Sequence, residues 1–398
     1  MIGTPPSPGF RSRFGADPEL SYTLPTYHYT DREIYRREVG EIFHKSWLLA
    51  GYLHDLERPG SYITCKRLDQ NVLVVRGRDG RLRGFHNVCM HRGHELVAGK
   101  GRADVFTCPY HGWSYDGEGR LRAAANAENV KGFDFDELGL RPVAVDILLN
   151  MVFINFDPAA RPMDEIYGGL EAEVRALLPD YDALALYRTD VYDLACNWKL
   201  IFDAMDCYHC PSLHPQAMGP DAYYKPSFEI TGHDWWALHI IRGNADVIGG
   251  RVDGSIAYDI RTDHPLQDVY IWWMWPTVYL TVHQGNPNMK VLFAMPSAID
   301  RSWETVDNFL LGDPPLAEDI ANIDNFRDNI QAQDLAAVES QQRGLRSRGY
   351  REGRLMVDRE RSWASEHGVH HFHRLCWEAV NGRPLDGWDG AGPGAAGG

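Results

Sequence analysis

The sequence lacks the marks of several broad classes of protein. No apolar run approaches the roughly 20 residues of a transmembrane helix, and the opening residues, MIGTPP, contain no basic segment followed by an apolar one, as a secretion signal would. A formal net charge of −15 argues against a nucleic-acid-binding surface, which would be basic. Seven cysteines in 398 residues fit a reducing compartment better than a disulfide framework. These absences predict a cytoplasmic protein that binds neither membranes nor nucleic acid.

Two short motifs give the clearest positive signal. Cys89-Met-His91 and Cys108-Pro-Tyr-His111 are separated by 16 residues. Two thiolates and two imidazoles in this C-x-H…C-x-x-H arrangement suit a [2Fe–2S] cluster with two sulfur ligands on one iron and two histidines on the other. Zinc also binds such quartets, but a zinc finger normally opens with C-x₂₋₄-C. The flanking residues 91–94 and 109–116 resemble the Rieske signature and favour the cluster.

A second metal site is indicated downstream. His209 and His214 can supply the histidines of a two-histidine, one-carboxylate iron site, which leaves positions open for dioxygen. Pro211 lies between them, and we expect it to break a helix there so that both imidazoles reach one ion. By itself this spacing is a weak signal, but here it follows a Rieske motif.

The two motifs together resemble the catalytic α subunit of Rieske non-haem iron oxygenases. The similarity is greatest to the branch of choline, carnitine and glycine-betaine monooxygenases and betaine N-demethylases. Residues 206–215, DCYHCPSLHP, resemble the E-C-Y-H-C-P…H-P of that branch, with Asp206 in place of Glu. The resemblance implies a mononuclear Fe(II) with Asp334 as its third ligand, because Asp334 stands five residues before Glu339, as in the family. Asp328 and Glu339 compete for this role.

The resemblance also implies an assembly and a fold. Asp206 would link His209 to the second cluster histidine, His111, of a neighbouring subunit in a head-to-tail homotrimer. The implied fold class is α+β, with a small all-β Rieske domain and a helix-grip-like catalytic domain of antiparallel sheet and helices. We place an N-terminal segment and helix at 1–49, the Rieske domain at 50–157, the catalytic domain at 158–385 and a disordered tail at 386–398.

The implied activity is that of a terminal oxygenase. The chain shows no dinucleotide-binding fingerprint, a G-x-G-x-x-G between a strand and a helix, so electrons from NAD(P)H would arrive through a separate flavin and iron–sulfur reductase. With these electrons and dioxygen, the enzyme would hydroxylate or N-demethylate a small quaternary ammonium or N-methylated compound. N-demethylation would release formaldehyde. An aromatic acid is the alternative substrate, and an electron-transfer protein without oxygenase activity is a third interpretation.

Several other residue groups allow two interpretations. Four aromatic side chains could form a cation–π cage for a substrate ammonium, or could simply pack in the core; they are Trp235, Trp273, Trp275 and Tyr279. Cys207 and Cys210 are predicted to pack within the iron motif and not to form a redox pair. The histidines at 367, 370, 371 and 373 are predicted to lie at the surface or at an interface. Residues 31–47, 164–178 and 316–348 are predicted helices, and 270–283 and 289–295 predicted strands.

Overall fold

The computed structural model describes residues 10–385 except 205, 207, 215–222, 244–260, 262 and 361–364, with no side-chain description for 211 and 223–228. The predicted disordered tail at 386–398 and Cys207 lie outside the described residues. The chain divides into two compact units, one of Phe43–Glu173 and one of Met1–Ile42 with Val174–Gly398. Within the described residues, no helix is long and apolar enough to cross a membrane.

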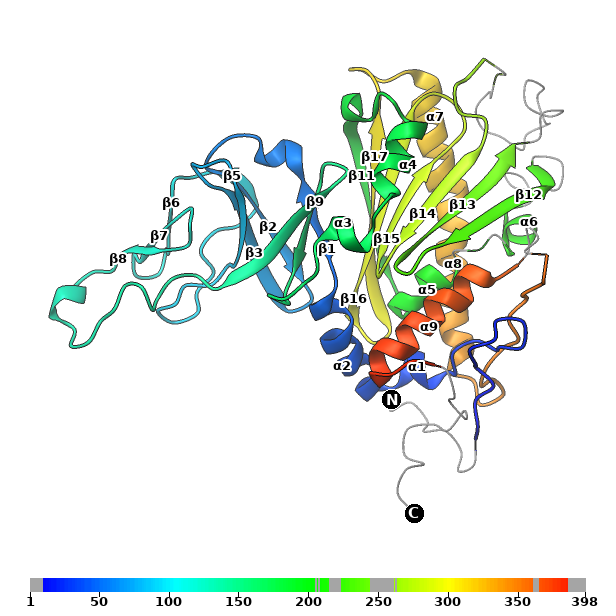
Figure 1. The fold of residues 1–398 in the computed structure, drawn as a ribbon, viewed down its shortest axis with the longest axis horizontal. Coiled ribbons are helices and arrows are strands. Elements are labelled where there is room, and N and C mark those ends of the chain that lie inside the picture. Colours follow the sequence, from blue (N-terminus) through cyan, green and yellow to red (C-terminus); the bar gives the residue numbers. More distant parts are fainter. Residues whose placement is uncertain are drawn as a thin grey trace. The chain divides into compact units, whose positions relative to one another are not determined.

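The unit Phe43–Glu173 is built from antiparallel strands (Figure 1). A seven-stranded sheet has the order β1-β10-β9-β4-β3-β2-β5, and a three-stranded sheet has the order β6-β7-β8. The strands are β1 (Leu48–Tyr52), β2 (Ser61–Arg67), β3 (Gln70–Arg76), β4 (Leu82–His86), β5 (Lys100–Arg102), β6 (Val105–Thr107), β7 (Ser114–Asp116), β8 (Leu121–Ala123), β9 (Pro142–Leu148) and β10 (Met151–Asn155). The short helices of this unit are η1 (Phe43–Lys45), η2 (Leu53–Leu56), η3 (Ala127–Asn129) and α3 (Met163–Ile166).

The core of this unit includes the two predicted cluster cysteines. Cys89 and Cys108 are each 2% exposed and share an apolar cluster with Phe106 and Tyr115. Two free thiols at the centre of a small core are well placed to coordinate a metal cluster, because they are shielded from solvent and held by packed neighbours.

The second unit is organised around a seven-stranded antiparallel sheet of order β11-β17-β16-β15-β14-β13-β12. Its strands are β11 (Ala185–Leu194), β12 (Tyr223–Gly232), β13 (Trp236–Gly243), β14 (Val269–Met274), β15 (Val278–Val282), β16 (Asn288–Ala298) and β17 (Arg301–Leu310). Its helices are α1 (Tyr27–Thr30), α2 (Arg32–Glu41), η4 (Tyr181–Ala183), α5 (Trp198–Asp203), α6 (Cys210–Leu213), α7 (Ala317–Asn325), η5 (Phe326–Gln331), α8 (Ala332–Leu345) and α9 (His367–Asn381). Helix α4 (Leu170–Leu177) spans the boundary between the units.

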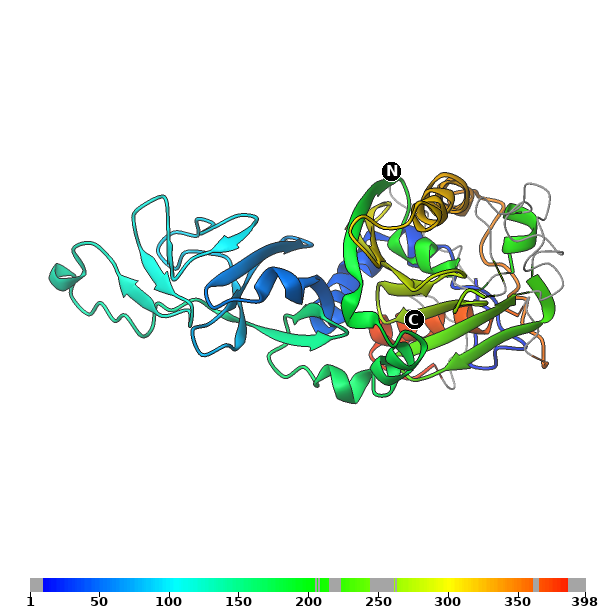
Figure 2. The same ribbon diagram turned by 90° about the horizontal axis from the view of Figure 1, so that it is seen from above.

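Alternate residues of the sheet face the helices. Trp273 of β14 packs on Phe372 of α9, with ring centroids 5.7 Å apart, whereas Ile271 on the same strand faces a cavity that α8 also lines. Both contacts lie on one face because side chains two residues apart on a strand point the same way. Figure 1 shows α7 and α8 as one long segment beside this sheet, and Figure 2 shows the same helices nearly end-on.

Three predicted elements differ in detail from those observed. The single strand expected at 270–283 is a hairpin, because Trp275 and Pro276 separate β14 from β15, and proline cannot donate a ladder hydrogen bond. The helix expected at 164–178 is interrupted between α3 and α4, where Gly169 adopts a φ of +89°. The helix expected at 31–47 begins as predicted, with the Asp31 carboxylate capping Glu33 and Ile34, but ends at Glu41.

Candidate metal centres

The two cysteine loops have the same backbone fold. In the first, the Cys89 amide donates to the His94 carbonyl at 2.8 Å, and the Gly93 amide donates to the Cys89 carbonyl at 3.0 Å. In the second, Cys108 bonds to Trp113 at 2.7 Å and Gly112 bonds to Cys108 at 3.0 Å. Gly93 and Gly112 both have a φ of +76°, which glycine adopts without steric cost. Each loop therefore presents its cysteine from an equivalent turn.

The two predicted cluster histidines face each other between these loops. The ring centroids of His91 and His111 are 4.7 Å apart, and Trp113 stacks on His91 at 4.8 Å. An Arg92 guanidinium nitrogen lies 2.6 Å from His111 Nε2. Two buried thiols and two adjacent imidazoles form the donor set that a Rieske cluster requires, so the residues present fit the cluster.

Tyr115 is a cluster-side residue that we did not predict. Its hydroxyl accepts a hydrogen bond from the Met90 amide at 3.0 Å and lies 3.5 Å from Cys89 Sγ. Hydrogen bonds to ligand sulfur are one way a protein sets the potential of such a cluster. The sequence carried a signal for it, because Tyr115 lies within the stretch 109–116 that matches the Rieske signature.

The second site is built around the short helix α6. His209 and His214 flank this single turn, and the Leu213 and His214 amides donate to the carbonyls of His209 and Cys210 at 2.8 and 2.9 Å. The expectation that Pro211 breaks a helix between the histidines is wrong. Proline stands in the first turn of α6, where its missing N–H costs nothing, and the two histidines lie beyond the ends of the turn.

Asp334 completes this site from the first turn of α8. Its Oδ1 lies 3.4 Å from His209 Nε2 and 3.0 Å from His214 Nε2. Separations of about 3 Å are those expected between adjacent ligands that are each about 2.1 Å from one ion. Two imidazoles and a carboxylate are also the donors that a mononuclear non-haem iron takes. These three residues therefore fit that metal.

The competing acidic residues lie elsewhere. Asp328 is exposed and pairs with Arg327 at 2.6 Å, and the Glu339 carboxylate accepts a hydrogen bond from the Ala195 amide at 2.9 Å. Neither has a recorded contact with His209 or His214 in the described structure. The geometry therefore favours Asp334 over both of them as the third ligand.

The electrostatics of the triad agree with an ionised carboxylate between two imidazoles. Burial alone would raise the pKa of Asp334, but hydrogen bonds from His209 and His214 outweigh it and hold that pKa below its usual range. Burial opposes the positive form of His214, yet the Asp334 hydrogen bond leaves the His214 pKa raised. The Gln333 side-chain amide lies 2.7 Å from His214 Nδ1 and orients the ring.

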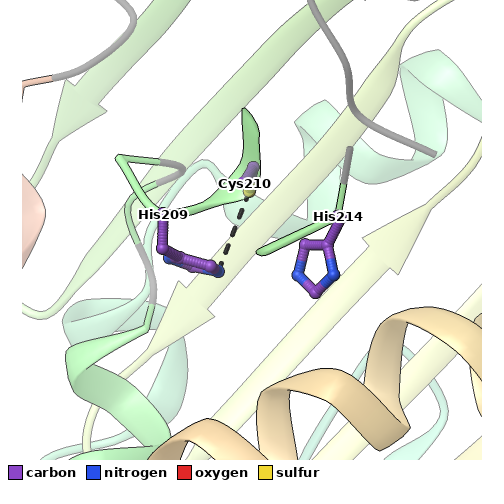
Figure 3. Close-up of side chains that lie close together, drawn as sticks. All are labelled: His209, Cys210 and His214. Carbon is purple, nitrogen blue, oxygen red and sulfur yellow. Dashed lines mark hydrogen bonds between the residues drawn. The ribbon is translucent and has the colours of Figure 1, made fainter. Parts of the chain in front are cut away.

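Cys210 is a further donor beside the site (Figure 3). Its Sγ is 3.8 Å from His209 Nε2, and one donor atom each from His209, Cys210 and His214 fall within 4.8 Å of one another. Asp334 Oδ1 contacts both imidazoles more closely, and oxygen donors suit a dioxygen-activating iron better than a soft thiolate. Asp334 is therefore the better third ligand.

Asp206 is buried and close to α9. Its Oδ2 accepts a hydrogen bond from the Val369 amide at 2.8 Å, and its Oδ1 lies 3.5 Å from His239 Nδ1. Burial raises the pKa of Asp206 to about 7, although the Val369 and Gly368 amides oppose the shift. In the described residues no contact joins Asp206 to His209, so the predicted link between the metal sites stays a prediction. His239 was not foreseen as its neighbour.

A cavity of about 140 Å³ adjoins the triad. His209, His214 and Asp334 are among its lining residues, together with side chains of β13–β17, α5 and α8. An apolar cavity of roughly 150 Å³ holds one benzene-sized molecule. The space next to the triad therefore suits a small substrate.

Of the four predicted aromatic residues, Tyr279 lines the cavity. Trp273 and Trp275 instead pack on Phe372 of α9, with centroids 5.7 and 6.2 Å away, and Trp235 lies 6.4 Å from Trp275. Trp273 and Trp275 thus pack in the core of this structure. A cation–π contact between Tyr279 and a substrate ammonium stays a prediction.

Of the four C-terminal histidines predicted to lie at the surface or at an interface, two are half-buried and two are buried within the chain. His370 and His373 are buried in α9, and His373 Nε2 is 2.7 Å from Asp203 Oδ1 at the end of α5. The Tyr29 hydroxyl donates to the other Asp203 oxygen at 2.8 Å. The network ties α9 and α1 to α5, the helix that precedes the candidate metal ligand His209, which explains why these polar side chains occupy a helix core.

Comparison with known proteins agrees with both centres. Residues 46–134 match the family model of the Rieske [2Fe-2S] domain, and residues 181–382 match that of the ring hydroxylating alpha subunit (catalytic domain). The chain therefore belongs to the family of ring-hydroxylating α subunits and is the oxygenase subunit of a Rieske system. In this family, one domain holds a [2Fe–2S] cluster, the other holds a non-haem iron, and a separate reductase supplies electrons.

Particular relatives are similar along most of their length. The chain is 35% identical to the carnitine monooxygenase oxygenase subunit of Escherichia coli (strain K12), over 91% of this chain and 95% of the relative. It is 30% identical to the chloroplastic choline monooxygenase of Spinacia oleracea, over 90% and 78%. The solved structure of the quaternary ammonium Rieske monooxygenase CntA with L-carnitine is 32% identical, with a TM-score of 0.81 over 92% of this chain and 98% of that one. Naphthalene 1,2-dioxygenase from Rhodococcus sp., 19% identical with a TM-score of 0.76, shares the fold.

Proposed function

We propose that this oxygenase attacks an N-methyl carbon of a small quaternary ammonium compound. In the proposal the cluster supplies electrons one at a time and the iron is where dioxygen is activated. The cluster ligands are Cys89, His91, Cys108 and His111, and the iron ligands are His209, His214 and Asp334.

The carrying observation is the character of the cavity beside the triad. The described residues that line it include neither lysine nor arginine, whereas an aromatic acid would need a cation to replace the hydration of its carboxylate. Apolar side chains such as Ile201, Ile241 and Val269 form much of its wall and can contact N-methyl groups. The relatives named for carnitine and choline support the same substrate class.

The proposal includes an assembly. Asp206 is buried, and its Oδ1 has no hydrogen-bond partner among the described residues. We assign it the link between His209 and His111 of an adjacent subunit, so that each active site uses the cluster of its neighbour in a homotrimeric ring located in the cytoplasm. Sedimentation equilibrium of the holoenzyme tests the trimer, and a monomer with full turnover would contradict it.

A single turnover tests the substrate class. Chemically reduced enzyme is mixed with dioxygen and, separately, with glycine betaine, carnitine, choline or benzoate, and formaldehyde is measured. One formaldehyde per iron triad with a quaternary amine is expected, because hydroxylation at an N-methyl carbon gives a carbinolamine that releases formaldehyde. Oxidised amine without formaldehyde would place the attack at another carbon. Product from benzoate alone would overturn the proposed substrate class.

A further inference from the structure

Glu304 is a buried carboxylate in the wall of the cavity. It lies on β17 with 1% of its surface exposed. Apart from the metal-ligand candidate Asp334, it is the only acidic residue among the described lining residues. Its side chain points to the cavity face of the sheet, as does that of Val306 two residues further along β17, which pairs with the cavity-lining Leu292.

The carboxylate is only partly satisfied by the protein. Gln331 Nε2 donates to Oε1 at 2.9 Å, while Oε2 has no hydrogen-bond partner among the described residues. Its register neighbours on the adjacent strands are Tyr192 and Ala294, neither of which is basic. No ion pair of Glu304 occurs within the part of the chain that the structure describes. Ionising a buried carboxyl group that has no nearby cation is costly, so Glu304 beside an active-site cavity calls for a positive partner from outside the fold.

Gln331 also fixes the position of this carboxylate relative to the iron triad. It is the last residue of the π-helical turn η5, three residues before Asp334. The same backbone segment therefore holds both the hydrogen-bond donor to Glu304 and the predicted iron ligand. A group bound against Glu304 would be held at a set place with respect to the reacting centre.

We infer that Glu304 is the counter-ion for the substrate ammonium group in this cavity. A quaternary ammonium carries charge but no N–H, so it needs a nearby negative group and apolar contacts for its methyls, not a set of hydrogen-bond acceptors. The cavity supplies one free carboxylate oxygen and apolar walls. A primary ammonium would need three acceptors, and the low polarity of the site strengthens attraction to a charge that makes no hydrogen bond.

The inference rests on the proposed function, so its test separates charge recognition from activity. Two pairs of probes have the same shape and differ by the ammonium charge: choline with 3,3-dimethylbutan-1-ol, and glycine betaine with 3,3-dimethylbutanoate. Dissociation constants are measured by calorimetry on the anaerobic metal-loaded enzyme, and formaldehyde from the quaternary probes is measured in parallel. Variants are Glu304→Gln, which keeps an oxygen for Gln331, and Glu304→Asp, which keeps the charge.

Asp307→Asn is the matched control. Asp307 lies on the same strand, is also buried, and accepts a hydrogen bond from the Thr189 hydroxyl on the opposite face of the sheet. The change removes a carboxylate charge near the cavity without touching its wall. Iron content and the visible spectrum of the cluster confirm that each variant is loaded.

We expect the wild type and Asp307→Asn to bind at least one quaternary ammonium probe about 10- to 100-fold more tightly than its carbon isostere. Glu304→Gln should bring that ratio close to one by weakening the cation and not the isostere, while Glu304→Asp should retain a preference. An unchanged ratio in a metal-replete Glu304→Gln enzyme overturns the inference. If the wild type oxidises quaternary amines but binds them no more tightly than the isosteres, the inference is overturned and the proposed function stands. A wild type that neither binds nor oxidises any quaternary probe overturns both.

Discussion

The ion pair between Lys199 and Glu38 is fully buried, which makes it a sharp test of the energetics of this fold. Lys199 Nζ lies 2.5 Å from Glu38 Oε1, and both side chains are 0% exposed. The other Glu38 oxygen accepts the Trp198 indole N–H at 3.0 Å. Nζ also lies 5.1 Å from the Tyr29 ring centroid and 5.3 Å from that of Trp198. The lysine therefore joins α5 to α2 at a site that water does not reach.

Lys199→Met should be strongly destabilising. Methionine fills a similar volume but leaves the Glu38 carboxylate buried without its cation, and breaking such a pair costs about 3–5 kcal/mol. For a unit of this size a loss of 1 kcal/mol lowers Tm by roughly 2–4 °C, so we expect a fall of about 6–20 °C. Glu38→Gln should have a comparable effect, because it leaves the ammonium unpaired.

The double variant isolates the interaction. With Lys199→Met and Glu38→Gln together, no charge is left unpaired and the glutamine oxygen can still accept the indole N–H. We expect the double variant to be more stable than the sum of the single losses predicts, by about 2 kcal/mol or more. Unfolding is followed by circular dichroism on preparations of equal iron content. The reasoning would be refuted if Lys199→Met lowered Tm by less than about 2 °C. It would also be refuted if the stability loss of the double variant equalled the sum of the two single losses.

Three other predictions concern the metal sites and the cavity. Asp334→Ala should lower the iron content from about three to two per chain without changing the cluster spectrum, because one ligand of the triad is lost. Cys210→Ala is the control and should keep all three irons. The reverse pattern would make Cys210 the ligand. Asp206→Asn should keep both centres but reduce coupled turnover by at least roughly 100-fold, since the inter-site hydrogen bond loses its charge; near-normal turnover of metal-replete protein would count against the link. Burial raises the pKa of Glu304 to about 8, above about 4.3 for an unfolded glutamate, so the substrate-free fold loses stability as pH rises from about 4.3 through 8. The stability of Glu304→Gln relative to wild type should therefore increase by about 2–3 kcal/mol between pH 6 and pH 9 in urea unfolding, whereas a constant difference would show that the carboxyl titrates normally.

The sequence was more informative about the candidate metal ligands than about the residues around them. Cysteine and histidine spacings are local, so Cys89, His91, Cys108 and His111 could be grouped before any fold was known. Asp334 lies 120 residues beyond His214 and could be selected only through resemblance to a family. Its rivals, Asp328 and Glu339, differ from it by their positions around the helix, and spacing alone does not determine which position meets the imidazoles.

The remaining differences arise from tertiary packing. His373 was expected at the surface or at an interface because its segment resembles a family helix without a ligand role, but its partners Asp203 and Tyr29 come from segments far away in the chain. Glu304 looks like an ordinary strand residue in the sequence, and only the register of β17 and the approach of Gln331 show it to be a buried cavity residue. Turn chemistry explains the hairpin at Pro276, which a composition-based strand prediction overlooked.

The π-helical turn η5 has a consequence for how this site is oriented. Successive residues of a regular α-helix are about 100° apart around the helix axis. A wider π turn changes this angle, so the side-chain positions of α8 are rotated relative to those expected if α7 continued as a regular helix. If the same residues formed a regular α-helix, with no deletion to compensate, Asp334 would be rotated relative to α7 and away from His209 and His214. Within α7 and within α8, the residues that share a packing face would stay the same. The direction in which the Asp334 carboxylate points therefore depends on the wide-turn conformation of a six-residue segment, Phe326–Gln331, and not only on the identity of the acidic residue.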